Sequence, residues 1–87
     1  MDKIKNRYPQ KKIRRYVIAT LDIPTFYLQY KCKGKWQFNA DIENATKTLS
    51  KNLAKELLSL YYQDTGRYHD ELVIVPIEIS YDILEVE

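Results

Sequence analysis

The sequence predicts a small α+β domain, in which an antiparallel sheet of three or four strands is covered on one face by a single helix. Three observations support this fold class. Residues 16–23 and residues 73–83 have the alternating or β-branched pattern of strands. The segment after Ser50 has apolar residues three and four apart, as a helix does. At 87 residues the chain is long enough for one core and too short for two.

The first half of the chain predicts two strands followed by a short third one. Residues 16–23 are rich in β-branched side chains and stop at Pro24, and residues 26–31 alternate again as the antiparallel neighbour. Gly34 can supply the positive φ of a tight turn over residues 32–35, after which residues 36–38 return. The residues expected to share one face of the first strand are Val17, Ala19, Leu21 and Ile23.

The second half predicts one helix and one strand. Ser50 is the expected N-cap of a helix over residues 50–64, and Gly66 is its expected left-handed stop. Pro76 has no N–H to donate, so it places the last strand at a sheet edge or a bulge. The odd-numbered residues from Val73 to Ile83 form the buried face of that strand. The apolar stripe of the helix consists of Leu53, Leu57, Leu60 and Tyr61, widened by Ala54 and Leu58. The predicted order is therefore β-β-(β)-α-β.

Charge is distributed unevenly along the chain, although the net charge is only +2. Residues 1–35 carry ten Lys or Arg against Asp2 and Asp22, a net charge of +8, whereas residues 70–87 carry six acids and no base. Residues 1–15 have few apolar anchors among their bases, so we expect a mobile basic arm there and a single α+β domain over residues 16–87. The two charged ends either present an interaction surface or neutralise each other in the fold.

Catalytic chemistry is not indicated by the sequence. No Walker lysine loop, GxGxxG, HExxH, nucleophile elbow or paired CxxC motif occurs. Cys32 lies between two lysines without an identifiable orienting base, and His69 beside two acids is ordinary solvated sequence. A single Cys and a single His exclude an internal disulfide and are too few for a structural zinc site. We expect no enzymatic activity, no catalytic residue, no metal and no cofactor.

The expected compartment is the cytosol. No apolar run approaches the roughly 18 residues of a membrane span, and the charged N-terminus lacks the apolar segment of a signal peptide. We therefore expect no membrane partner.

A succession of short segments carries a resemblance. In order, the chain contains Tyr16-Val17-Ile18, Phe26-Tyr27-Leu28, Gly34-Lys35-Trp36, residues 41–47 leading into Ser50-Lys51, and a closing strand over residues 73–79. This succession, over about residues 16–80, resembles small accessory proteins of bacteriophages and prophages of Gram-positive bacteria. The resemblance implies a protein that acts by binding, and some such proteins inhibit host defence systems, including CRISPR nucleases. The basic segment before Tyr16 lies outside it.

The leading functional hypothesis is an inhibitor that docks on a nucleic-acid-handling host protein, for example a CRISPR nuclease. In one form of this hypothesis, an acidic surface occupies the positive nucleic-acid groove of the partner in place of phosphates. In the other form, the basic arm contacts the partner. Glu78 and Asp82 are expected about 13 Å apart on one face of the last strand. The acidic residues expected at this surface are Glu78, Asp82, Asp70 and Glu71.

Direct binding of DNA or RNA is the alternative hypothesis. Cations neutralise phosphates, and aromatic rings can stack on unpaired bases. Eight tyrosines are too many for so small a core, so some are expected at the surface. The residues expected to contact nucleic acid are Lys11, Lys12, Arg14, Arg15, Lys33 and Lys35. A structural oligomer is a third hypothesis, because a small domain with an open sheet face can gain stability as a homodimer.

Overall fold

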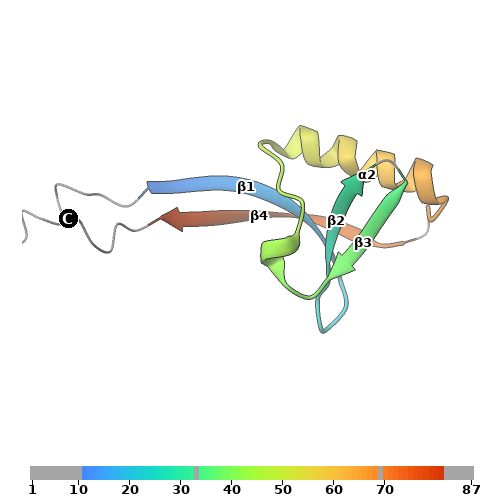
Figure 1. Cartoon of the computed structure of the whole chain (residues 1–87), viewed down its shortest axis with the longest axis horizontal. Coiled ribbons are helices and arrows are strands. Elements are labelled where there is room, and N and C mark those ends of the chain that lie inside the picture. Colours follow the sequence, from blue (N-terminus) through green and yellow to red (C-terminus); the bar gives the residue numbers. More distant parts are fainter. Residues whose placement is uncertain (1–10, 33, 69, 82–87) are drawn as a thin grey trace, which may run out of the picture.

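A computed structural model describes residues 11–32, 34–68 and 70–81 of the chain (Figure 1). Its elements are β1 (Lys11–Thr20), β2 (Tyr27–Cys32), β3 (Lys35–Asn39), the 3-10 helix η1 (Ile42–Asn44), α2 (Lys51–Thr65) and β4 (Leu72–Tyr81). The strands form one antiparallel sheet in the order β3-β2-β1-β4, beside the single α-helix. The predicted α+β class is confirmed. None of the helices described is long and apolar enough to cross a membrane.

β1 and β4 form the longest ladder of the sheet, from Lys11 opposite Tyr81 to Thr20 opposite Leu72. The far half of this ladder, residues 11–15 with residues 77–81, projects from the body of the domain and is called the ribbon below (Figure 1). The expectation of a mobile arm over residues 1–15 is therefore corrected for residues 11–15, which belong to β1. Their partners for backbone pairing come from β4, 62 to 70 residues later in the chain, and so local composition could not reveal them. Residues 1–10 lie outside the described residues.

The other end of β1 is shorter than expected. β1 stops at Thr20, and Leu21 and Ile23, expected on its buried face, are 59% and 97% exposed. Thr20 closes the loop to β2: its N–H donates to the Phe26 carbonyl at 2.9 Å and its hydroxyl oxygen accepts from the Phe26 N–H at 3.0 Å. The chain therefore turns at Thr20, before Leu21 can continue the alternation.

β1 and β2 diverge, and a segment near residue 48 joins the sheet where they part. The N–H of Tyr16 donates to the Thr48 carbonyl at 3.0 Å, and the N–H of Thr48 donates to the Tyr16 carbonyl at 2.9 Å. Both backbone groups of Tyr16 thus face Thr48 rather than Pro76, its partner in β4. Pro76 therefore lies in an edge strand, as predicted. Its pair with Tyr16 is one that forms no backbone hydrogen bonds, so the N–H that proline lacks is not needed there.

α2 covers one face of the sheet over the main core. Ser50 caps its start by accepting the Leu53 N–H at 3.1 Å, and Gly66 ends it at φ 71°, a left-handed conformation. Both predicted ends are confirmed. The buried cluster at this face is formed by Ile18, Leu28 and Tyr61, and the half-buried side chains packed against it are Trp36, Phe38, Leu57, Leu58, Tyr62, Leu72 and Ile74.

The buried face of α2 is rotated relative to the predicted stripe. Ala54 and Tyr61 are its buried residues, whereas Leu53 and Leu60 are 44% and 38% exposed. The sheet explains the rotation, because two aromatic rings of β3 stand where Tyr61 can pack against them. Burying that phenol ring brings Ala54 inward and turns Leu53 and Leu60 toward solvent.

Candidate nucleic-acid interface

The ribbon contains the four basic residues of β1, which are at positions 11, 12, 14 and 15. Lys12 and Arg14 are exposed on one face of the strand, and Arg15 is half-buried on the other. Arg15 donates from Nη1 to the carbonyl of Arg14 at 2.8 Å, which holds its guanidinium close to the strand. The backbone of Lys11 pairs with Tyr81, and its side chain lies outside the described part.

One acid of β4 faces these bases. Glu78 is directly opposite Arg14 in the ladder, and its carboxylate lies 3.9 Å from the Lys12 ammonium. The Lys12 and Glu78 side chains are 59% and 56% exposed, so their ion pair is worth at most about 1 kcal/mol. Glu78 is the only acid of β4 against four bases of β1, so the ribbon keeps a positive excess.

The residues of the expected acidic surface are spread along β4. Asp70 is half-buried and structural, because its carboxylate accepts the Tyr61 hydroxyl and its backbone carbonyl accepts the Tyr62 hydroxyl, both at 2.8 Å. Glu71 is exposed just before β4, seven residues or about 23 Å from Glu78 along the strand. Asp82 lies outside the described residues. Of the residues expected at this surface, Asp70 and Glu71 therefore do not gather around Glu78.

The remaining two predicted nucleic-acid contacts lie in the turn between β2 and β3. Lys35 is exposed at the start of β3, and Lys33 lies outside the described residues. This turn is at the end of the body opposite to the free end of the ribbon (Figure 1). Lys35 consequently does not extend the basic surface of β1.

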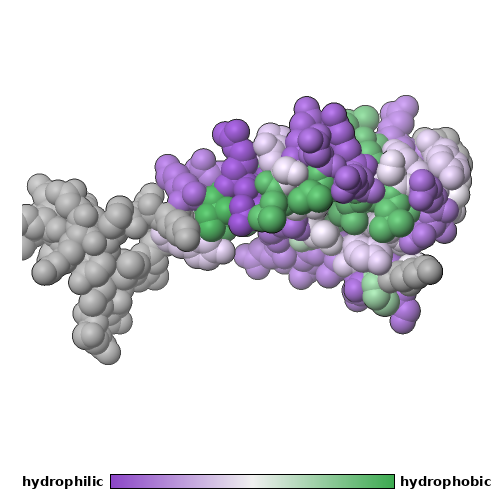
Figure 2. Space-filling view, turned by 90° about the horizontal axis from the view of Figure 1, so that it is seen from above, coloured by the Kyte–Doolittle hydropathy of each residue, from purple (hydrophilic) through white to green (hydrophobic). Residues whose placement is uncertain are grey.

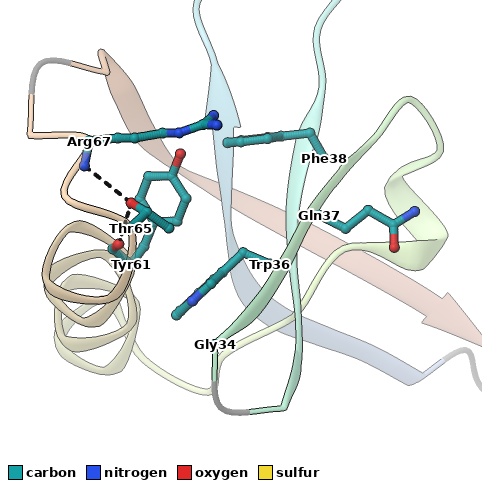
Figure 3. Close-up of a pocket in the computed structure, with 7 residues that line it drawn as sticks. All are labelled: Gly34, Trp36, Gln37, Phe38, Tyr61, Thr65 and Arg67. Carbon is teal, nitrogen blue, oxygen red and sulfur yellow. Dashed lines mark hydrogen bonds between the residues drawn. The ribbon is translucent and has the colours of Figure 1, made fainter.

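A pocket of about 280 Å³ lies between β3 and the C-terminal end of α2 (Figure 3). We call it the aromatic pocket; it is lined by Gly34, Trp36, Gln37, Phe38, Tyr61, Thr65 and Arg67. Trp36 and Phe38 point from β3 toward the ring of Tyr61, with centroids 5.4 and 5.8 Å from it and rings close to perpendicular to it. The side chain of Gln37 points away from these rings in Figure 3.

Hydrogen bonds hold the polar atoms of this pocket in place. The indole Nε1–H of Trp36 donates to Asp64 at 3.0 Å, and the Thr65 hydroxyl donates to the Tyr61 carbonyl at 2.7 Å. Burial raises the pKa of the Tyr61 phenol above its ordinary 10.0, and the hydrogen bond to Asp70 adds to the increase. Tyr61 is thus a protonated donor at neutral pH and is not activated as a base or nucleophile.

The aromatic pocket is not recognisable as a site from the sequence. Trp36, Phe38 and Tyr61 were each expected in an element, but an aromatic residue at strand or helix spacing is ordinarily core. The alternation of Trp36 and Phe38 in the five-residue strand β3 is the one local signal, and it does not indicate that Tyr61 and Arg67 lie beside these two rings.

The described residues were also compared with the requirements of metal binding and thiol chemistry. Within residues 11–32, 34–68 and 70–81, no three His, Cys, Asp or Glu side chains are placed to hold a metal ion. Cys32 is an exposed free thiol at the end of β2, and His69 lies outside the described residues.

An apolar groove runs beside α2. Its exposed members are Leu49, Leu53 and Leu60, which are 66%, 44% and 38% exposed. With Leu57, Lys47, Thr48 and Glu56 they line a depression of about 410 Å³, called the leucine groove below. Figure 2, seen from the helix side, shows a hydrophobic band along the long axis of the molecule. Exposed apolar area of this kind is typical of surfaces that contact another protein.

No family model, no curated protein and no solved structure matches the chain.

Proposed function

We propose that this chain is a non-enzymatic nucleic-acid-binding protein that contacts the phosphate backbone through its ribbon. The observation that carries the proposal is the positive excess of the ribbon, a projecting pair of strands that has four basic residues in β1 and the single acid Glu78 in β4. A two-stranded ribbon is narrow enough to enter the major groove of DNA. Lys and Arg side chains on both faces of the ribbon would contact phosphates on both sides of such a groove.

The strand conformation favours this contact over a solvated tail. Lys12 and Arg14 are fixed two residues apart, about 6.6 Å, on one face. Two strands hold the bases in register, so less chain entropy is lost on binding than for an unpaired arm. The exposed ion pair with Glu78 is weak enough for Lys12 to exchange the carboxylate for a phosphate.

Fluorescence anisotropy of the full chain with a labelled DNA duplex, repeated between about 50 and 200 mM salt, tests the proposal. Four phosphate contacts predict that the logarithm of the affinity falls with the logarithm of salt concentration at a slope of about −3.6. Arg14→Ala should weaken binding and reduce the slope by about 0.9, whereas Lys55→Ala, on the exposed face of α2, should change neither. Absence of binding at about 50 mM salt would refute the proposal.

A second candidate function is the one suggested by the resemblance, an inhibitor docked on a nucleic-acid-handling host protein such as a CRISPR nuclease. The leucine groove favours it, because a protein partner would bury Leu49, Leu53 and Leu60. The expected acidic surface supports this candidate less well than the leucine groove does, because Glu78 already has a basic partner in Lys12.

Co-purification with such a nuclease, before and after nucleic-acid digestion, separates the two candidates. A complex that survives digestion and is lost in Leu60→Glu, but kept in Leu21→Glu, a control at an exposed leucine outside the groove, supports docking by the groove. Glu78→Lys would weaken the complex if the acidic face carried it. A complex that disappears on digestion supports nucleic-acid binding instead.

A further inference from the structure

We propose that the aromatic pocket binds the base of an unpaired nucleotide, with Arg67 holding the attached phosphate. This is a second site, separate from the ribbon, and it stands whether or not the ribbon contacts nucleic acid.

The walls of the pocket suit a flat ring. Trp36 and Phe38 alternate along β3, so their side chains leave the same face of the strand, about 6.6 Å apart. Both rings are half-buried, while Tyr61 is 1% exposed and lies across them at 79° and 82°. A ligand can therefore reach Trp36 and Phe38, with Tyr61 as the wall behind them. Every nucleobase has a π-face that stacks on such rings, whatever its sequence identity.

Hydrogen bonds within the protein itself hold the rings of Trp36 and Tyr61 in place. The indole N–H of Trp36 is occupied by Asp64 and the hydroxyl of Tyr61 by Asp70, at 3.0 and 2.8 Å. Neither ring has to reorient to keep its polar atom bonded when a ligand enters. Binding thus loses little side-chain entropy, which is the usual benefit of a preorganised site.

Arg67 supplies the charge. Its side chain is exposed and extends past the Tyr61 hydroxyl toward Phe38 (Figure 3). The salt bridge found among the described residues joins Lys12 to Glu78, so no described carboxylate pairs with Arg67. A guanidinium that has no acidic partner among the described residues, at the edge of a cluster of aromatic rings, is a group that can recognise phosphate with two parallel hydrogen bonds. A nucleotide supplies both groups, a planar base for the rings and a phosphate for the guanidinium.

The dimensions favour one unpaired base. At about 280 Å³ the pocket is near the lower end of small-molecule sites, which begin at about 300 Å³. A base inside a duplex is paired and stacked, and it cannot enter such a pocket without leaving the helix. Open space around Gly34, where an added Cβ would meet nothing within 4 Å, leaves room for the sugar and backbone at the mouth.

Trp36 is the only tryptophan of the chain, so its fluorescence reports on this site alone. The full chain is titrated with thymidine monophosphate, with a short single-stranded oligothymidine and with a blunt duplex. Stacking predicts saturable quenching by a single-stranded ligand and none by the duplex. Quenching by the monophosphate identifies a free nucleotide as sufficient, and quenching by the oligothymidine alone identifies an unpaired nucleotide within a strand. Absence of quenching by both would overturn the proposal.

The matched variants are Arg67→Ala and Arg14→Ala, two exposed arginines changed in the same way. Loss of a charge-assisted contact to phosphate should weaken binding of the quenching ligand about tenfold in Arg67→Ala. Monophosphate binding should be unchanged in Arg14→Ala, even if that variant no longer binds duplex at the ribbon. Circular dichroism checks that both variants fold. Equal binding by Arg67→Ala and the parent chain would refute the phosphate contact.

Discussion

Replacing Tyr61 by Phe removes one hydroxyl from the centre of the core and leaves the ring in place. That hydroxyl donates to the Asp70 carboxylate at 2.8 Å, and Tyr61 is 1% exposed. A hydrogen bond to a charged group contributes about 1.5 to 3 kcal/mol. Asp70 is half-buried and regains some water when its donor is lost, so we expect a loss of about 1.5 kcal/mol. For a domain of this size that lowers Tm by about 6 to 12 °C.

The same hydroxyl predicts how stability depends on pH. Burial and the bond to Asp70 raise the pKa of Tyr61 in the folded protein above 10.0. The contribution of the protonated phenol is therefore complete below pH 10.0 and is lost as the pH rises from there through the folded pKa, because the unfolded chain ionises first. Tyr61→Phe has no such group, so its stability deficit relative to the parent chain should shrink in strong alkali.

Thermal unfolding followed by circular dichroism, from neutral pH to above pH 10, measures both effects. The control is Tyr68→Phe, because Tyr68 is 68% exposed and its hydroxyl should matter little. The reasoning fails if Tyr61→Phe and Tyr68→Phe have the same Tm at neutral pH, or if the deficit of Tyr61→Phe grows with pH.

Three further predictions concern the fold, each measured by denaturant unfolding. Ile18→Ala should cost about 2 to 5 kcal/mol because Ile18 is 1% exposed, whereas Leu21→Ala should stay within about 0.5 kcal/mol; similar losses would contradict the core assignment. Gly66→Ala should cost about 1 to 2 kcal/mol, since an alanine is strained at φ 71°, and an unchanged midpoint would argue against the left-handed cap. Lys12→Ala should cost less than about 1 kcal/mol, because its ion pair with Glu78 is more than half exposed; a larger loss would mean that the ribbon depends on this pair.

Elements with strong local signals were predictable from the sequence. Ser50 and Gly66 mark the ends of α2 because an N-cap and a left-handed stop are chosen by residues within one turn of them. Pro76 marks an edge strand because a missing N–H excludes it from the middle of a sheet. The positive φ of Gly34, 77°, likewise follows from its own turn.

The start of β1 was not predictable, nor was the orientation of α2. Residues 11–15 are basic and poor in apolar side chains, and they become a strand through pairing with residues 77–81. Leu53 and Leu60 satisfy helical spacing as well as Ala54 does, so periodicity alone cannot say which of them faces the sheet. The rings of Trp36 and Phe38 decide this by packing against Tyr61.

The amino-acid sequence by itself determined the α+β class, the bounds of the helix and the concentration of bases near the N-terminus, because these depend on neighbours within a few residues. Only the tertiary structure decided that four of those basic residues belong to a ribbon that also contains Glu78, and that Arg67 lies beside three aromatic rings. Both juxtapositions join residues that are far apart in the chain. Antiparallel pairing and side-chain packing bring them together, and neither leaves a mark in the local pattern of either partner.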